Sequence, residues 1–396
     1  MRLAVYCDYS YRVDGDNVYA QLPFGLFLRE LASHCDRLVV TGRLDPTPGP
    51  YPYLMAGIDF VPLPHYASGA DFRRVIRTLP TGLRRFWRTL AEVDVVWILG
   101  PNPPQAIAFA LLAAARRRRT VLGVRQNLPE LVRHRHNGRR SVHLAAIALE
   151  WAFRLMARFM PVVVVGPDLA RRYRRAKSLH MLYVSLLSEA HILAPTDGQR
   201  AYHGGELRIL SVGRLDPEKN PLLLADVLER ALRTEPRWRL QVCGAGMLRD
   251  ALARRLRELG IADRAELLGH VAFGHGLWER YRSSHVLLHV SLTEGLPQVL
   301  LEAFAARLPV VATAVGGVPD LVEGRGLLVP RSDADAAATA LHRLVVDHEL
   351  RGAVVDAAAA EVHRHTREAE CARLASFLSA ESGRDIAIPD RHYPHE

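Results

Sequence analysis

The sequence predicts an α/β protein made of two doubly wound, parallel-sheet domains. Short apolar segments alternate with longer amphipathic segments along most of the chain, as in successive βα units. At 396 residues the chain exceeds what one hydrophobic core usually holds, which favours two domains. A polar, glycine-rich stretch at 196–206 (TDGQRAYHGGE) separates two such series and marks the boundary.

Near-continuous apolar runs identify the strands, because parallel strands are buried on both faces. The first series comprises 2–6, 37–41, 93–99, 120–124 and 161–165. The second comprises 207–212, 238–243, 265–269, 285–290, 309–312 and 326–329. We expect domains at 1–198 and 199–365, then a segment at 366–396 that holds a helix returning to the first domain and a loose tail from residue 385. Ligands of such sheets bind beyond the carboxyl ends of the strands, so we look for the site in loops that follow strands.

The composition indicates a globular protein without a membrane-spanning helix. Hydrophobic residues make up 49% of the chain and charged residues 24%. The four cysteines show no metal or redox spacing, which indicates reduced thiols and a cytoplasmic location. The chain shows no signal peptide, and its longest apolar stretches, 106–115 and 160–166, are shorter than the ~20 residues that a spanning helix needs.

The first half is strongly basic. Residues 1–200 contain 28 Lys and Arg against 15 Asp and Glu, whereas the remainder contains 24 against 27. This half either meets an anionic partner or is an arginine-rich surface with solvated helices. Segment 72–90 (FRRVIRTLPTGLRRFWRTL) mixes apolar side chains with arginines like a helix in a membrane interface, broken into two pieces at 80–82. A peripheral position on an anionic membrane surface is therefore one hypothesis.

Two cations lie close to a predicted helix start in SVGRLDPEKNP. Arg214 ends a strand and Lys219 precedes Asn220, the expected N-cap, with Pro221 as the first helical residue. A helix N-terminus with two adjacent cations suits a diphosphate. An ordinary surface Arg and Lys flanking a loop is the alternative interpretation.

Two glutamates eight residues apart, Glu294 and Glu302, lie in LTEGLPQVLLEAF. We expect a turn at 291–297 and a helix at 297–306. The first amides of that helix have no intrahelical partner and suit a phosphate. The candidate donor-binding stretch is Gly295, Leu296, Pro297, Gln298 and Val299, in which Pro297 has no N–H. Glu302 then lies near the helix mouth, within reach of ribose hydroxyls, and Glu294 lies on the sugar side. A capping glutamate and a surface glutamate would give the same pattern.

Glycines follow two other strands. Gly316 and Gly317 in TAVGGVPDLV would let backbone amides approach a donor sugar. Gly244 and Gly246 resemble the start of a dinucleotide fingerprint, but the third glycine is missing. A tight strand-to-helix turn explains that second pair better.

Taken together, SVGRLDPEKNP, LGHV, SLTEGLPQVLLEAFAARLPVVAT and VGGVPDLV resemble the C-terminal half of the retaining GT-B glycosyltransferases. The resemblance is to their large E-x7-E group, typified by sucrose, mannosyl and glycogen-type transferases, and covers about residues 205–335. It implies the GT-B fold, with an acceptor-binding and a nucleotide-sugar-binding Rossmann-like domain facing across a cleft. Arg307 replaces a usual glycine, which we expect to change only a helix cap, and Asp320 replaces a usual glutamate.

The resemblance also implies roles for the residues above. Arg214 and Lys219 would hold the donor diphosphate, and Glu302 the ribose. Glu294 would bind the hydroxyls of the donor sugar, and backbone near His270 and Val271 would face the base. UDP is the commonest donor nucleotide of the family. The implied reaction retains the anomeric configuration through front-face attack, with the departing phosphate taking the acceptor's proton.

The first half resembles the family only in outline. The usual glycine-rich loop after the first strand is here CDYSYRVDGDNVYAQ, with the single Gly15, and RQN replaces the usual histidine after strand 120–124. Gly15, Arg125 and Gln126 are therefore our acceptor-side candidates. The acceptor itself is left open between a glycan, a lipid-linked molecule and a small molecule.

Two Asp-x-Asp matches, DGD at 14–16 and DAD at 333–335, are of a kind that occurs often by chance. Since Arg214 and Lys219 supply the cations, we expect neither a metal nor another cofactor. Two other functions stay open. A nucleotide-sugar epimerase or phosphorylase uses the same fold. A nucleic-acid-binding protein would account for the pI of about 9.8, but no RNA-binding module accompanies the arginines and we expect no nucleic-acid partner.

Overall fold

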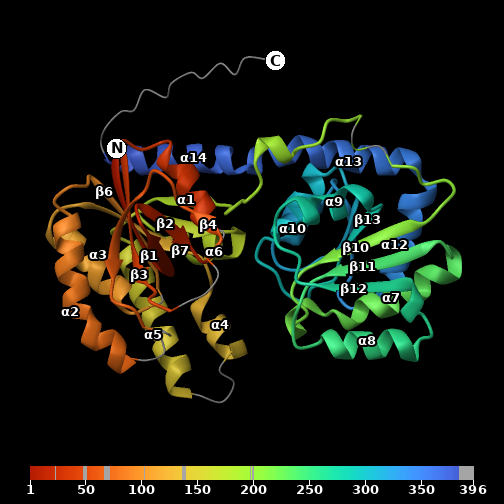
Figure 1. Ribbon diagram of the computed structural model, residues 1–396, viewed down its shortest axis with the longest axis horizontal. Coiled ribbons are helices and arrows are strands. Elements are labelled where there is room, and N and C mark those ends of the chain that lie inside the picture. Colours follow the sequence, from red (N-terminus) through yellow and green to blue (C-terminus); the bar gives the residue numbers. More distant parts are fainter. Residues whose placement is uncertain are drawn as a thin grey trace. The chain divides into compact units, whose positions relative to one another are not determined.

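The computed structural model describes residues 1–22, 24–47, 51–66, 72–101, 103–135, 140–196, 198 and 200–382. The chain divides into two compact units (Figure 1). Residues Met1–Leu186 and the C-terminal helix α14 (Arg367–Ser382) form the first unit, and Leu187–Thr366 form the second. The first unit is built on a mainly parallel sheet and the second on a fully parallel one, each with a hydrophobic core on both faces. The tail expected from residue 385 lies outside the described residues.

Parallel strands of the first unit run in the order β5-β3-β1-β6-β7-β8-β9. Their bounds are β1 (Arg2–Asp14), β3 (Arg37–Leu44), β5 (Asp59–Leu63), β6 (Val95–Gly100), β7 (Arg119–Val124), β8 (Val162–Val165) and β9 (Leu179–Leu182). Two short antiparallel strands, β2 (Asn17–Ala20) and β4 (Tyr53–Leu54), extend from β1. All five strands predicted for this half are present, and the sequence analysis missed the four short ones.

The segment CDYSYRVDGDNVYAQ is not the loop that the sequence predicted. Strand β1 continues through it, with a shift of register between Tyr6 and Ser10, and turns back into β2. The turn consists of Gly15 and Asp16, and Gly15 has φ +57°, which a tight hairpin turn requires. Gly15 therefore lies at an exposed hairpin tip.

Helices cover both faces of this sheet. On one face α1 (Phe24–Ala32) and α14 share a core that includes Phe27, Leu31, Cys371 and Leu374. On the other face lie α2 (Phe72–Thr89), α3 (Gln105–Ala115) and α5 (Arg140–Ala157), with α4 (Leu128–Arg135) and α6 (Pro167–Arg172) completing the unit. The return of the last helix to the first unit, predicted from the sequence, is visible in this shared core.

Helix α2 corrects a second prediction. It is continuous through Pro80, so the expected break at 80–82 does not occur. Phe86 and Leu90 are fully buried against the sheet, and Trp87 is stacked under the guanidinium of Arg116. Part of the apolar side of this segment therefore packs into the core, while Ile76, at 64% exposure, and Trp87, at 42%, stay at the surface. Among the described helices, none combines the length and the apolar character needed to span a bilayer.

The second unit has six parallel strands in the order β12-β11-β10-β13-β14-β15. Their bounds, β10 (Leu207–Val212), β11 (Trp238–Cys243), β12 (Ala265–Gly269), β13 (Val286–His289), β14 (Val310–Thr313) and β15 (Leu327–Val329), agree with the prediction to within one residue at each end. Helices α7 (Leu222–Thr234), α8 (Arg249–Glu258) and α12 (Ala334–Val346) cover one face. The other face carries α9 (His275–Ser283), α10 (Gln298–Ala305), α11 (Val318–Val322) and α13 (His348–Val362).

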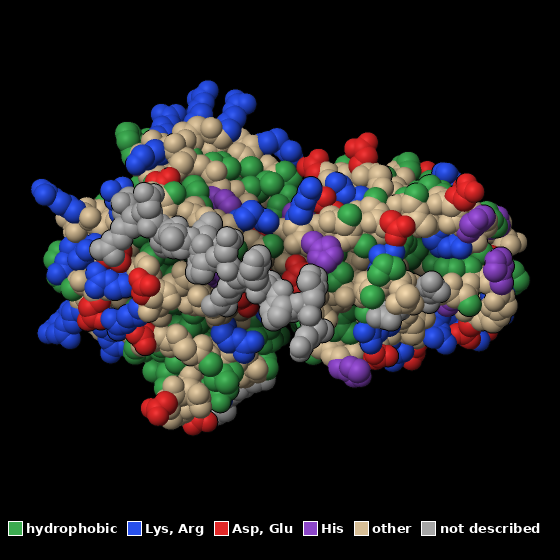
Figure 2. Space-filling view, turned by 90° about the horizontal axis from the view of Figure 1, so that it is seen from above, with side chains coloured by type: hydrophobic (Ala, Val, Ile, Leu, Met, Phe, Trp, Pro, Cys, Tyr) green, Lys and Arg blue, Asp and Glu red, His purple; other side chains and the backbone are tan. Residues whose placement is uncertain are grey.

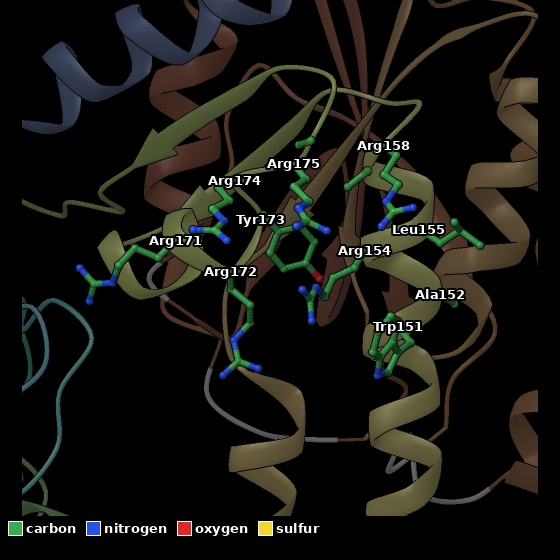
Figure 3. A pocket seen from close by; sticks show the side chains of 12 residues that line it. Trp151, Ala152, Arg154, Leu155, Arg158, Arg171, Arg172, Tyr173, Arg174 and Arg175 are labelled. Atoms are coloured by element: carbon green, nitrogen blue, oxygen red, sulfur yellow. The ribbon is translucent and has the colours of Figure 1, made fainter.

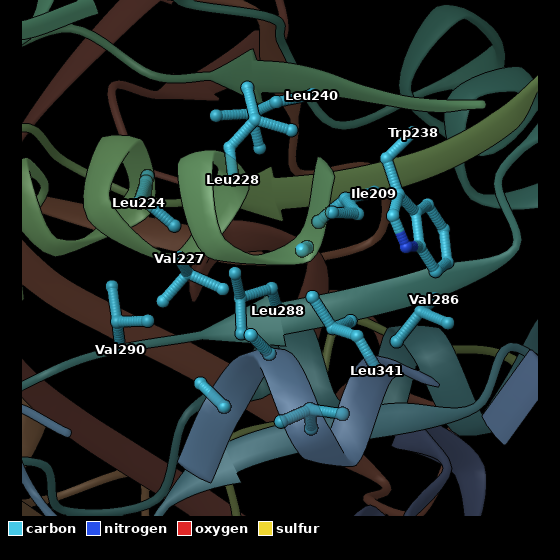
Figure 4. Packing of buried hydrophobic residues seen from close by; sticks show 14 of the residues in the cluster. Ile209, Leu224, Val227, Leu228, Trp238, Leu240, Val286, Leu288, Val290 and Leu341 are labelled. Carbon is cyan, nitrogen blue, oxygen red and sulfur yellow. The ribbon is translucent and has the colours of Figure 1, made fainter. Parts of the chain in front are cut away.

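Side chains from two helices meet the sheet in the core of the second unit (Figure 4). Leu224 and Leu228 of α7 and Leu341 of α12 pack against the strands beside Leu288 and Trp238. Leu228 and Leu341 are fully buried, and each such burial contributes roughly 2 kcal/mol to folding. The core fixes the sheet whose carboxyl edge carries the candidate site.

The second unit begins before the predicted boundary at 198/199. Leu187 packs in the core cluster that contains Leu210, and the Leu193 amide donates to the carbonyl of Ala305 over 2.9 Å. Residues from 187 onward therefore belong with the second sheet. The polar, glycine-rich stretch that was predicted to be the boundary therefore lies within the second unit.

Candidate functional site

A pocket of about 260 Å³ opens at the carboxyl ends of β10 and β13. These strands are neighbours in the sheet, and the strand order reverses between them. Ligands of doubly wound sheets bind at this switch point. The lining includes Arg214, Lys219, His289, Ser291, Glu294, Leu296, Pro297, Gln298 and Val299.

The loop after β10 is braced by the loop after β11. Gly213 donates to the carbonyl of Cys243 over 3.0 Å, and Leu215 to that of Ala245 over 2.9 Å. A Cβ on Gly244 would lie 1.8 Å from the Gly213 oxygen, so only glycine permits this approach. Gly244 thus serves loop packing, as the sequence interpretation favoured, and holds the backbone that carries Arg214.

The helix start after this loop differs from the prediction. A short 3₁₀ turn, η2 (Pro217–Lys219), precedes α7, and Asn220 takes a left-handed conformation with φ +50°. Pro221, expected as the first helical residue, is the N-cap of α7. Asn220 does not cap the helix; it reverses the chain after Lys219, because asparagine tolerates this conformation better than most residues do.

Glu294 is the most heavily contacted acid in the pocket. Its Oε1 accepts from the Lys219 ammonium and from the Ser291 hydroxyl (2.6 Å), and His289 Nε2 lies 3.1 Å away. Burial by itself would raise the pKa of Glu294, but His289 and Lys219 outweigh it and lower the pKa to about 2. Oε2 has no partner among the described residues and is available as a hydrogen-bond acceptor.

His289 and Ser291 are site residues that the sequence analysis missed. They stand at the end of the apolar run HVLLHVS, where two polar side chains follow buried strand positions. That contrast was the available signal, since side chains at strand ends face the ligand edge. Lys219, which completes the cluster, lies 75 residues from Glu294 in the chain.

Arg214 is more exposed than Lys219, with 60% of its side-chain surface accessible. Its guanidinium pairs with Asp216 and with Glu218 of the same loop, the second over 2.5 Å. Arg214 therefore lines the pocket as a solvated cation that is paired with acids of its own loop.

Helix α10 points its N-terminus at the pocket, and Leu296, Pro297, Gln298 and Val299 line the wall there. The space beside Gly295 is open, since a Cβ there would meet no atom within 4 Å. The N-terminus of a helix attracts anions, although here the Leu300 amide already donates to the Pro297 carbonyl over 3.2 Å. The predicted helix mouth and its open glycine are thus in place.

Gly316 and Gly317 support this turn from behind. A Cβ on Gly316, whose φ is +52°, would lie 1.8 Å from the carbonyl oxygen of Glu294. The Gly317 amide donates to the Gly295 carbonyl over 3.1 Å, so it is already used within the protein. Neither glycine is among the residues that line the pocket. Gly316 packs against the backbone of Glu294, and Gly317 holds that of Gly295.

Glu302 lies further inside α10 and is 93% buried, at 7% exposure. The Tyr281 hydroxyl donates to Oε2 over 2.6 Å, a contact that the sequence analysis missed. Burial raises the pKa of Glu302 to about 7, although the Tyr281 bond lowers it in part. Glu302 is not among the residues that line the pocket, so the two glutamates occupy opposite electrostatic environments.

The remaining candidates lie elsewhere. Val271 is half-buried against a hydrophobic cluster and does not line the pocket. In the first unit, Arg125 at the end of β7 lies 4.2 Å above the Phe24 ring and donates to the Tyr9 hydroxyl. Gln126 beside it is exposed.

The two Asp-x-Asp matches have structural roles. Asp333 caps α12 by accepting from the Ala336 amide over 2.9 Å, and Asp335 pairs with Arg230 over 2.7 Å. Asp14 and Asp16 flank Gly15 at the exposed hairpin. In the described part of the chain, no three His, Cys, Asp or Glu side chains gather where they would hold a metal ion.

Comparison with known families matches residues 197–361 to the model described as "Glycosyl transferases group 1". The O-antigen biosynthesis glycosyltransferase WbnH of Escherichia coli is 32% identical over 33% of this chain and 35% of its own length. The D-inositol 3-phosphate glycosyltransferase of Kineococcus radiotolerans is 36% identical over 37% and 38%. An exopolysaccharide phosphotransferase of Streptomyces coelicolor is 37% identical over 35% and 15%. The chain thus spans less than two fifths of the length of each of these relatives.

Solved structures resemble nearly the whole chain. Anabaena HepE in complex with UDP superposes with a TM-score of 0.71 at 18% identity, covering 96% of this chain and all of that one. The sucrose-phosphate synthase of Thermosynechococcus elongatus gives 0.68 at 17% identity, covering 96% and 98%. At these identities the likeness establishes the fold, which is GT-B with two Rossmann-like units, as predicted.

Proposed function

Residues 197–361 belong to the group 1 glycosyl transferases, and from this premise we propose that the chain transfers a sugar from a nucleoside-diphosphate sugar to an acceptor hydroxyl. One observation carries the proposal: Arg214, Lys219 and Glu294 converge on a pocket at the mouth of α10, on the switch point of the second sheet. A diphosphate needs cations and is favoured by a helix N-terminus, and a sugar needs a carboxylate. This pocket offers all of them.

The diphosphate is assigned to Lys219, Arg214 and the first amides of α10. Lys219 has three N–H donors and spends one on Glu294, which leaves donors for phosphate oxygens. Arg214 must exchange Asp216 and Glu218 for the ligand, and its exposure makes that exchange easy. Both cations stabilise the charge that develops on the leaving diphosphate, a contribution of roughly 3 kcal/mol for one well-placed donor.

The sugars are assigned to the two glutamates. Glu294 stays ionised at every physiological pH and offers Oε2 to hydroxyls of the donor sugar. The E-x7-E resemblance supports assigning ribose to Glu302 and the base to the backbone near Val271, although neither residue lines the pocket. The complex of Anabaena HepE with UDP supports UDP as the donor nucleotide.

For the reaction course we propose retention of configuration without a metal ion. The sequence pattern of Glu294 and Glu302 supports retention through the E-x7-E resemblance. With the diphosphate held by side-chain cations, the departing phosphate oxygen accepts the proton of the attacking hydroxyl. Residues of the site therefore position and stabilise, and none of them needs to form a covalent intermediate.

For the acceptor we propose a glycan, free or lipid-linked, bound by the first unit in the cytoplasm. The names of the relatives, which include O-antigen and exopolysaccharide proteins, support a polysaccharide or its lipid-linked precursor. Arg125 and Gln126 stand after a strand end, where such sheets bind ligands. Gly15 at the hairpin tip completes the candidates.

Thermal-shift screening with UDP, GDP and ADP tests the donor assignment. We expect one nucleotide to raise the melting temperature. Arg214→Gln should need about ten times more of that nucleotide for the same rise. The control Arg254→Gln, at an exposed position, should respond like the wild type. Incubation with the matching sugar donor and a glycan should then release the nucleoside diphosphate. No shift with any nucleotide would refute the assignment, and sugar conversion without an acceptor would support an epimerase instead.

A further inference from the structure

The outer face of α5 is apolar where a surface helix is normally polar. Its exposed positions include Leu144, Ala148, Trp151 and Leu155, and Phe159 follows just after the helix. Leu144 is 65% exposed, Trp151 63% and Phe159 73%, so these side chains lie almost free of the core. A spacing of three or four residues places the helical ones on one stripe. We call these five residues the α5 stripe.

Beside the stripe lies a groove of about 660 Å³ between α5 and the segment that begins with α6. Figure 3 shows Trp151 and Leu155 on one side and Tyr173 between the two segments. Six arginines line the groove, namely Arg154, Arg158, Arg171, Arg172, Arg174 and Arg175. The Arg154 guanidinium lies 5.3 Å from the Trp151 ring centroid, which ties the charged groove to the apolar stripe.

Among the described residues, two acidic groups lie at this groove, against six arginines. Asp168 pairs with Arg171 at one end. Glu150 is 97% buried, at 3% exposure, and lies beneath the groove, where it interacts electrostatically with Arg172 and Arg154. Lys and Arg side chains also gather over the first unit on the face drawn in Figure 2. The groove therefore presents an excess of cations next to exposed hydrocarbon.

We propose that the α5 stripe and the arginine groove dock the first unit on a membrane that contains anionic phospholipid. A bilayer interface offers both chemistries at adjoining depths, phosphates for the guanidinium forks and hydrocarbon for Trp151, Leu155 and Phe159. Tryptophan is favoured at that interface because its ring is amphipathic. A nucleic acid would need further aromatic side chains for stacking, and Trp151 is the one exposed aromatic among the lining residues.

This surface replaces the one suggested by the sequence. Segment 72–90 has the composition of an interfacial helix, yet Phe86 and Leu90 are committed to the core. In α5 the side chains of the stripe remain outside, whereas Phe153 and Ala157 of the same helix are buried in the core. The two surfaces make a matched pair for experiment, because α2 also carries exposed arginines, Arg84 and Arg88, and an exposed Trp87.

Sedimentation of the full chain with vesicles tests the proposal. At low salt the protein should bind vesicles of phosphatidylcholine with phosphatidylglycerol and not vesicles of phosphatidylcholine alone. Each arginine near such a surface contributes roughly fivefold to affinity, so R174Q/R175Q should weaken binding about 25-fold. The control R84Q/R88Q, which removes the same charge from α2, should retain nearly all of the binding.

Tryptophan quenching locates the contact. The chain has five tryptophans, and brominated lipid should quench the one that enters the interface. We expect Trp151→Phe to remove most of the quenching and Trp87→Phe to leave it unchanged. The proposal is overturned by a lack of vesicle binding at low salt, by equal binding of R174Q/R175Q and the wild type, or by quenching that follows Trp87. Tighter binding to polyuridylate than to vesicles, lost in R174Q/R175Q, would also overturn it and assign the groove to nucleic acid.

Discussion

Substituting glutamine for each glutamate of the site should give opposite effects on stability. The pKa of Glu302 is raised from 4.5 to about 7, whereas that of Glu294 is lowered from 4.5 to about 2. A raised pKa means that the folded state holds its proton more tightly than the unfolded state. Stability then falls as the pH rises from 4.5 through 7. A lowered pKa works in the opposite sense, and its contribution is lost as the pH falls from 4.5 towards 2.

Both shifts correspond to about 3 kcal/mol, since one unit is worth about 1.4 kcal/mol. The free energy of unfolding of Glu302→Gln should therefore equal that of the wild type near pH 4. At pH 8 it should be about 3 kcal/mol higher than that of the wild type. The amide oxygen of glutamine still accepts from Tyr281, so that bond is kept. Glu294→Gln should lose about 3 kcal/mol at pH 8, because His289 and Lys219 no longer face a carboxylate.

Urea unfolding of both variants at pH 4 and pH 8 measures these differences. Carbon-13 NMR of glutamate carboxyls supplies the direct check, with one signal titrating near pH 7 that is absent from Glu302→Gln. Glu294→Gln should bind the donor at least tenfold more weakly, since it replaces a hydrogen bond to a charged carboxylate by one to a neutral amide. The reasoning fails if every carboxyl titrates below pH 5, or if Glu302→Gln is less stable than the wild type at pH 8.

Three further outcomes are expected. Gly316→Ala should destabilise the second unit by more than the ~1 kcal/mol that a left-handed alanine costs, because its Cβ also displaces the Glu294 carbonyl. The matched control is Gly324→Ala, since Gly324 has φ +73° and open space around it. Equal losses of the two variants in urea unfolding would contradict the contact. Lys219→Met should abolish the nucleotide-induced thermal shift and raise the pKa of Glu294, which the same NMR titration follows; an unchanged carboxyl signal would show that Lys219 does not hold it. Arg125→Ala should raise the KM for the acceptor while leaving the nucleotide thermal shift intact, and the reverse pattern in steady-state kinetics would remove Arg125 from the acceptor side.

The sequence predicted the elements that depend on local pattern. Runs such as HVLLHV in β13 identify buried strands by themselves, because a parallel strand shields both of its faces. The mouth of α10 was equally accessible, since a glycine and a proline precede its apolar run. The parallel sheets, the fold class and the loops that line the pocket all follow from these local signals.

Contacts between distant segments were beyond the sequence. Lys219 and Glu294 are 75 residues apart, and nothing near either of them indicates the other. The pairing of Tyr281 with Glu302 is hidden in the same way, because a tyrosine in an amphipathic helix looks like an ordinary core residue. Local signals also misled where packing overrode them. Pro80 is accommodated within α2, and β1 continues through the segment that was expected to form a loop after the first strand.

The last helix of the chain has a consequence for synthesis on the ribosome. Helix α14 completes the core around Phe27 and Leu31, but it is translated only after the whole of residues 187–366. One hydrophobic side of the N-terminal unit must therefore stay uncovered while the other unit is made, which leaves it open to chaperones and to premature association. A nascent chain stalled before Arg367 should be recognised as incomplete even though every strand of both sheets has already emerged.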